Sequence, residues 1–120
     1  MEKFSLKNEL IFLRHSKNIE AKKLFGDKET NASLVSQKKK FFLRHYFRGL
    51  NIHFVSPSLR CTQTHEMIWP DKKYIIKKNL KEQNFGEWEG LEFSKIPNIG
   101  FLNNFDLFKF KPPCGESNKD

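Results

Sequence analysis

Residues 9 to 18 read Glu-Leu-Ile-Phe-Leu-Arg-His-Ser-Lys-Asn, and this stretch decides the predicted fold. Its apolar run, Leu10 to Leu13, is bounded by charged residues and is too short for a helix. We therefore predict a buried strand that ends at Arg14 and His15. Ligands of open α/β sheets bind outside the carboxyl ends of the strands. A guanidinium beside an imidazole at that place is suited to hold and attack an anion.

The rest of the chain alternates between helix and strand patterns. Residues 17–30 are polar and contain Gly26-Asp27, which predicts a surface loop. The elements that follow are a helix over about 34–50 capped by Asn31 or Ser33 and closed by Gly49, a strand over 51–56, a helix ending near Trp69 before Pro70, and a strand over 73–77. This alternation predicts an α/β fold with a parallel sheet and right-handed crossovers.

The first predicted helix has one apolar face and a basic flank. Phe42, Tyr46 and Leu50 recur at i, i+4 and i+8, which is typical of a helix that packs against a core. Lys38 to Lys40 lies beside that face. We interpret the lysines as a solvated helix surface, and a nucleic-acid or lipid patch remains the alternative.

Composition restricts the classes of protein to which the chain can belong. The 120 residues fit one domain, and a hydrophobic content of 38% with 14% aromatic residues indicates a folded chain. The formal charge of +8 implies an anionic partner: a phosphate ester, a nucleic acid or an acidic lipid. The only two cysteines, Cys61 and Cys114, suggest no disulfide framework, so a cytoplasmic setting is expected. We see no signal peptide or membrane span and expect no membrane partner.

Three later segments carry further signals. Residues 56–64 read as a strand end, a helix cap and a first turn, which places Ser56, Ser58 and Arg60 where helix amides favour an anion. Residues 80–90 form a loop with two glycines and three carboxylates, and residues 93–110 predict one or two short helices packed over the sheet edge. Gly-Glu-Ser at 115–117 resembles a helix start, and the chain ends at Asp120.

These residues suit phosphoryl transfer through a covalent intermediate. A neutral His15 can accept a phosphoryl group, because an unperturbed imidazole has a pKa of about 6.5. Arg14 and Arg60 can bind phosphate oxygens with forked hydrogen bonds. Glu82 can protonate the leaving oxygen if burial raises the pKa of its carboxyl group. No Cys/His spacing resembles a zinc ligand set.

Four motifs in order resemble the histidine phosphatase superfamily, the phosphoglycerate-mutase-like family. They are Leu-Arg-His at 13–15, Ser-Pro-x-x-Arg-x-x-Gln-Thr at 56–64, Leu-x-Glu-x-x-Phe-Gly-x-Trp-Glu-Gly at 80–90, and Pro-Cys-Gly-Glu-Ser at 113–117. The third motif is similar to that of small phosphomonoesterases such as the alpha-ribazole phosphatase type.

The resemblance implies a parallel sheet with flanking helices and a small phosphorylated substrate. It implies that His15 is phosphorylated, that Arg14 and Arg60 bind phosphate, and that Glu82 donates a proton. Ser16, Asn18 and Ser56 are expected to support this site. No metal or organic cofactor is expected.

Two features depart from the family pattern. Ser16 stands where the family usually has glycine after the catalytic histidine. The family's second histidine follows a later helix and strand, and the chain ends before them; none of His45, His53 or His65 stands in a matching context, so we interpret these three as packed or solvated. We expect residues 1–120 to form a single, C-terminally incomplete domain whose uncovered edges favour a homo-oligomer or a complementing chain.

Three functional hypotheses remain open. The first is an active phosphatase, not separated from a mutase. The second is a shortened, weakly active or inactive member that binds anions or a partner chain. The third is a basic nucleic-acid-binding module, ranked last because basic and aromatic residues do not interleave on a recognisable platform.

Overall fold

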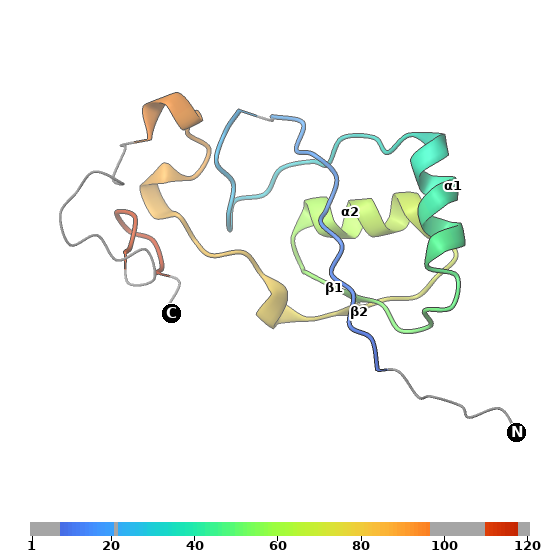
Figure 1. The fold of residues 1–120 in the computed structure, drawn as a ribbon. Coiled ribbons are helices and arrows are strands. Elements are labelled where there is room, and N and C mark those ends of the chain that lie inside the picture. The colour runs from blue at the N-terminus through green and yellow to red at the C-terminus, as the bar shows by residue number, and fades with distance from the viewer. Residues whose placement is uncertain (1–7, 21, 97–109, 118–120) are drawn as a thin grey trace, which may run out of the picture.

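The computed structural model describes residues 8–20, 22–96 and 110–117 of the chain. Its elements are, in order, α1 (Gln37–Tyr46), β1 (Phe54–Val55), α2 (Leu59–Ile68), β2 (Ile75–Ile76) and the 3-10 turns η1 (Lys78–Leu80), η2 (Gly86–Trp88) and η3 (Phe93–Lys95). Helices and strands alternate from α1 to β2, as Figure 1 shows, which confirms the predicted α/β class.

The sheet is a parallel pair of short strands. Phe54 lies opposite Ile75 and Val55 opposite Ile76. The backbone N–H of Ile75 donates to the carbonyl of His53 at 2.9 Å. The helix α2 connects the two strands, so the predicted parallel arrangement is confirmed, while both strands are shorter than predicted.

The predicted buried strand over residues 10–13 is wrong. These residues adopt no regular structure, and their side chains are 42–81% exposed. Within the described residues, the only sheet is the β1–β2 pair, and neither strand pairs with this segment. A strand needs a partner for its backbone groups and a surface for its side chains, and residues 10–13 have neither within the described part of the chain.

The helix α1 begins later than the sequence predicted because its expected caps are engaged elsewhere. Residues 31–33 pair with residues 17–19, through Ile19 N to Asn31 O at 3.0 Å and Ser33 N to Lys17 O at 2.6 Å. Ser36 is the N-cap instead, and its hydroxyl accepts from Lys39 N at 3.2 Å. The helix ends at Tyr46 with Phe47 as C-cap, so Gly49 lies beyond its end.

The aromatic face of α1 points away from the core. Phe42 is 60% and Tyr46 is 66% exposed, so our interpretation of this face as core-packing is wrong. Polar contacts attach the helix to α2: Arg44 Nε donates to the carbonyl of Ile68, and Nη2 donates to that of Met67 at 3.4 Å. Both carbonyls belong to the last turn of α2, and the helix dipole favours cations at that end of a helix.

The helix α2 begins and ends where the sequence predicted. Ser58 is its N-cap, and Trp69 is its C-cap directly before Pro70. Ile68 is 2% exposed and anchors a small core. The buried apolar residues of this core are Phe25, Ala32, Val35, Val55 and Ile68. Phe25 belongs to the predicted surface loop over residues 17–30, which is therefore partly buried.

His53 and His65, expected from the sequence to be packed or solvated, pack against each other. His53 Nδ1 and His65 Nε2 lie 2.9 Å apart, and His53 Nε2 lies 3.3 Å from the carbonyl of Leu50. Because a carbonyl only accepts, His53 carries its proton on Nε2 and accepts from His65 at Nδ1. His65 Nδ1 is buried without a hydrogen-bond partner among the described residues. Burial, with the neighbouring His53, lowers the pKa of His65.

Acid is expected to destabilise the fold through His65. Its pKa is lower in the folded chain than in the unfolded one, so the stabilisation is complete above about pH 6.5 and is lost as the pH falls toward the folded-state pKa. Urea unfolding on both sides of about pH 6.5 measures this loss. His65→Gln should reduce the loss, whereas His45→Gln, at an exposed position of α1, should leave it unchanged. An equal loss in all three proteins would contradict the role of His65.

The segment over residues 112–116 lies against the loop over residues 83–88. Glu116 N donates to Asn84 O at 2.6 Å, and Asn84 N donates to Glu116 Oε2 at 2.8 Å. Gly86 has a φ of 58°, and a Cβ there would lie 2.0 Å from Pro113 O. Residues 115–117 form no helix, and the helices predicted within 93–110 are represented by η3 alone, because residues 97–109 lie outside the described residues.

Candidate active site

His15 presents one ring nitrogen to an arginine. Its Nδ1 lies 2.6 Å from the carbonyl oxygen of Ser16, and its Nε2 accepts from Arg60 Nε at 3.3 Å. The carbonyl requires a proton on Nδ1, so Nε2 carries the lone pair. The half-buried ring is thus held in the tautomer in which Nε2 is the nucleophilic atom.

Arg60 lies in the first turn of α2 and is only 3% exposed. Its Nη2 donates to the carbonyl of Gly26 at 3.0 Å, and its Nε donates to His15. Its Nη1 is buried and has no hydrogen-bond partner among the described residues. Since a buried unpaired donor is costly, this nitrogen is suited to an anionic acceptor.

The pKa of His15 is lowered from its ordinary value. Burial of the ring is the largest cause, the hydrogen bond to the Ser16 carbonyl acts in the opposite direction, and the charges of Arg60 and Arg14 lower the pKa further. Glu82 raises it by a smaller amount. The imidazole is therefore neutral at neutral pH, as a nucleophile requires.

Arg14 and Glu82 lie at the exposed side of the site. Arg14 and Glu82 are both exposed, and both are close enough to act on the charge of His15. The Glu82 carboxylate accepts from Gln83 N at 3.0 Å. The burial on which the proton-donor prediction for Glu82 depends is thus not found in this structure.

Ser16 connects the segment that carries His15 to α2 and to the segment before α1. Its backbone N–H donates to Thr64 Oγ1 at 2.9 Å, and its hydroxyl donates to Ser33 O at 2.8 Å. Thr64 in turn donates to the carbonyl of Arg60 at 2.7 Å. Ser16 therefore positions His15. Thr64 stands within one of the four sequence motifs, but no role was predicted for it.

Asn18 and Ser56, the other two residues expected to support the site, contact segments that neighbour it. Asn18 forms an isolated antiparallel bridge with Ala32, and its Oδ1 is buried without a hydrogen-bond partner among the described residues. Ser56 is buried, and its hydroxyl accepts from Ser58 N at 3.3 Å and donates to Ser58 Oγ at 3.4 Å. Ser56 therefore stabilises the turn into α2.

Glu89 is a structural anchor that was not predicted from the sequence. Its carboxylate accepts from four backbone N–H groups, at distances of 2.8–3.2 Å. The donors are Gly26, Asp27, Lys28 and Phe85. Because the carbonyl of Gly26 also accepts from Arg60, Glu89 holds the backbone that positions the Arg60 guanidinium. Glu89 stands in the Trp-Glu-Gly part of the third motif, and this position is the sequence signal that could have indicated a structural role.

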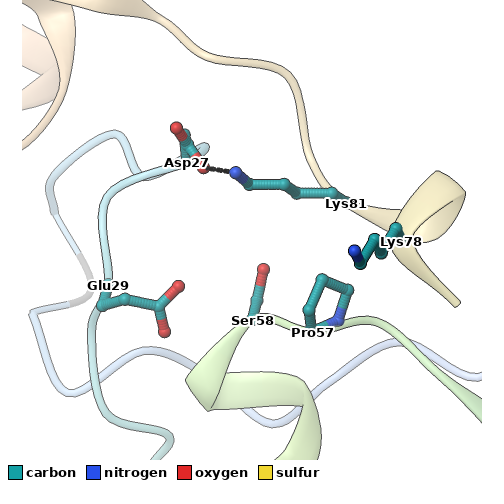
Figure 2. Close-up of a pocket in the computed structure, with 6 residues that line it drawn as sticks. All are labelled: Asp27, Glu29, Pro57, Ser58, Lys78 and Lys81. Atoms are coloured by element: carbon teal, nitrogen blue, oxygen red, sulfur yellow. Dashed lines mark ion pairs between the residues drawn. The ribbon is translucent and has the colours of Figure 1, made fainter. Parts of the chain in front are cut away.

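A pocket of about 340 Å³ opens at the N-terminus of α2, and Figure 2 shows the residues that line it. They are Asp27, Glu29, Pro57, Ser58, Lys78 and Lys81. Lys81 reaches across the pocket to form an ion pair with Asp27. Glu29 accepts from Leu59 N at 2.5 Å. One lining residue, Asp27, directly follows Gly26, whose carbonyl accepts from Arg60.

The chain belongs to the histidine phosphatase superfamily (branch 1), whose sequence profile matches residues 10–120. This confirms the resemblance drawn from the four motifs. No curated protein sequence matches the chain. Solved structures of the phosphoglycerate-mutase-like fold resemble it at 16–22% identity, which establishes the fold.

The similar structures are longer than this chain. A candidate alpha-ribazole-5'-P phosphatase from Escherichia coli has a TM-score of 0.70 and 18% identity, over 89% of this chain and 58% of its own. The protein TTHB049 from Thermus thermophilus has a TM-score of 0.65 and 22% identity, over 88% and 62%. Mycobacterial glucosyl-3-phosphoglycerate phosphatase Rv2419c has a TM-score of 0.64 and 16% identity, over 86% and 53%. The chain thus spans less than two thirds of each of these three proteins.

Two further observations concern the described residues alone. Their His, Cys, Asp and Glu side chains include no group of three or more that could hold a metal ion. None of their helices is long and apolar enough to cross a membrane.

Proposed function

We propose that the chain carries the phosphate-binding site of a phosphomonoesterase, with His15 as the phosphoryl acceptor. The observation that carries this proposal is the contact between His15 Nε2 and Arg60 Nε, beside a second Arg60 nitrogen that is buried and has no hydrogen-bond partner among the described residues. When a phosphoryl group binds here, its oxygens replace His15 Nε2 as the acceptors of the Arg60 N–H groups. This frees the lone pair of Nε2 to attack phosphorus.

The proposed reaction has two steps. In the first, Nε2 of His15 bonds to phosphorus while the bond from phosphorus to the leaving oxygen breaks, and that oxygen takes a proton from Glu82, whose exposed carboxyl group must be covered by the bound substrate to hold one. In the second, water bonds to phosphorus, the bond between nitrogen and phosphorus breaks, and Glu82 takes the proton of the water. Arg14 and Arg60 bind the phosphate oxygens in both steps.

The pocket at the N-terminus of α2 is the proposed place of the leaving group. It combines the Asp27–Lys81 ion pair with the ammonium group of Lys78 and the carboxylate of Glu29. Ionised side chains of both signs can hydrogen-bond to the hydroxyl groups of a small polar leaving group. The proposed substrate is therefore a small phosphorylated compound.

Phosphorylation of His15 tests the proposed function. Brief incubation with p-nitrophenyl phosphate, followed by alkaline quenching and peptide mass analysis, should find an acid-labile phosphoryl group on the peptide that contains His15. His15→Ala should lose both the label and the release of p-nitrophenol, whereas His45→Ala, at an exposed position, should keep both. Equal turnover with and without His15 would refute the assignment.

A second candidate function is favoured by the exposed apolar residues 10–13. In this alternative, the chain binds phosphate through His15 and Arg60 but turns over substrate only when another chain or segment covers these residues. Phosphate binding without labelling of His15 in the isolated chain supports it.

A further inference from the structure

The outer face of α1 is aromatic and uncovered within the described structure. Phe41 is 74%, Phe42 is 60% and Tyr46 is 66% exposed, and the rings of Phe42 and Tyr46 stack with their centroids 5.6 Å apart. With 3.6 residues per turn, positions 38, 41, 42, 45 and 46 share one face. In Figure 1 this helix lies at the edge of the molecule, with its long side free of other described segments.

Positive charge surrounds this aromatic face. Lys38 shares the face, Lys39 flanks it, and Arg48 donates to the carbonyl of His45 at 3.0 Å just beyond the end of the helix. Residues 31–65 contain no aspartate or glutamate. The nearest carboxylate that follows in sequence, Glu66, accepts from the hydroxyl of Tyr74 at 2.8 Å. The helix therefore presents aromatic rings and cations with no acidic neighbour in this stretch.

We propose that α1 docks on an anionic lipid surface, with Phe41, Phe42 and Tyr46 entering the interface and Lys38, Lys39 and Arg48 binding lipid phosphates and carboxylates. Exposed aromatic rings with a basic border are what interfacial helices use. Basic side chains near an anionic membrane add favourable electrostatic energy, and rings buried among headgroups remove apolar surface from water. This proposal does not depend on phosphatase activity.

Charge argues against a second copy of the chain as the occupant. Two α1 faces pressed together would bring two sets of lysines and arginines into contact, and the whole chain carries a formal charge of +8. Nucleic acid would satisfy the charge. However, the uncovered aromatic side chains are more readily explained by a partner with an apolar interior. No membrane partner was expected from the sequence, where the periodicity of α1 indicated a buried face and left a lipid patch at its lysines only as an alternative.

Sedimentation with lipid vesicles tests the proposal. The chain should sediment with vesicles that contain phosphatidylserine and stay in solution with phosphatidylcholine alone. Lys38→Gln should lower the partition coefficient about fivefold. Phe42→Ser should lower it about tenfold. Since both positions are exposed, circular dichroism should find both variants folded.

Two matched variants locate the effect on α1. Lys77→Gln removes the same charge from an exposed position outside α1, and Phe93→Ser removes a ring that is 56% exposed on η3. Both should bind vesicles as the parent chain does. Equal losses in the α1 variants and their controls would overturn the proposal. Absence of vesicle binding would do so too, as would salt-sensitive binding to single-stranded DNA without binding to vesicles.

Discussion

The variant Glu89→Gln is expected to lower the free energy of unfolding by about 3 kcal/mol. The carboxylate of Glu89 accepts four backbone hydrogen bonds, from residues 26–28 and from Phe85. An amide has only one oxygen, and its NH₂ group would face N–H donors that it cannot bind. Hydrogen bonds to charged groups contribute about 1.5–3 kcal/mol each, so losing two or more exceeds the effect of most substitutions.

Urea denaturation measures the effect of Glu89→Gln, and Glu87→Gln is the matched control. Glu87 lies two residues away and is exposed, and its carboxylate contacts Cys114 Sγ at 3.7 Å. Its amide variant should unfold within about 0.5 kcal/mol of the parent chain. If both variants unfold together with the parent, Glu89 is not the anchor of the loop over residues 26–28.

Local signals predicted the part of the fold around α2. Serine at an N-cap and proline after a C-cap are local residue preferences, and Ser58 and Pro70 stand at the two ends of that helix. The β-branched pair Ile75 and Ile76 likewise fell in a predicted strand. These predictions succeeded because the deciding interactions lie within a few residues of one another.

Two predictions that depended on distant partners failed. Leu10 to Leu13 has the composition of a buried strand, but a strand forms only where another chain segment satisfies its backbone groups. Similarly, the pattern at Phe42 and Tyr46 identifies one face of α1 without indicating which side meets the core. Periodicity determines which residues share a face, and the position of neighbouring elements decides whether that face is buried.

The sequence predicted the reactive residues of the site, but it did not predict the residues that hold them in position. His15 and Arg60 each lie within one of the four motifs, and the motifs predicted that both belong to one site. The two side chains are in contact in the structure. The contacts of Thr64 with Ser16 and of Glu89 with Gly26 join residues 48 and 63 positions apart. No local pattern specifies such pairs, since threonine and glutamate are mostly found on solvated surfaces.

The variant Arg60→Lys is expected to lower kcat/KM for p-nitrophenyl phosphate by about 10²–10³-fold. Lysine keeps the charge but replaces a planar fork with a single ammonium group. In this site, Arg60 uses its Nε on His15 and its Nη2 on Gly26 O, while Nη1 has no hydrogen-bond partner among the described residues. An ammonium group cannot occupy these three places at once, so phosphate oxygens lose directed donors when charge develops on them.

Steady-state kinetics with Arg48→Lys as the matched control separates this role from a general effect of charge. Arg48 is exposed beyond the end of α1, so the same chemical change there should leave kcat/KM within about twofold. Arg60→Lys should also slow the labelling of His15, because Arg60 acts in the step that forms the bond between nitrogen and phosphorus. A folded Arg60→Lys variant with unchanged labelling and turnover would mean that the buried guanidinium only supports the loop at Gly26. A slow variant whose labelling and turnover decline together would assign Arg60 to the phosphoryl group itself.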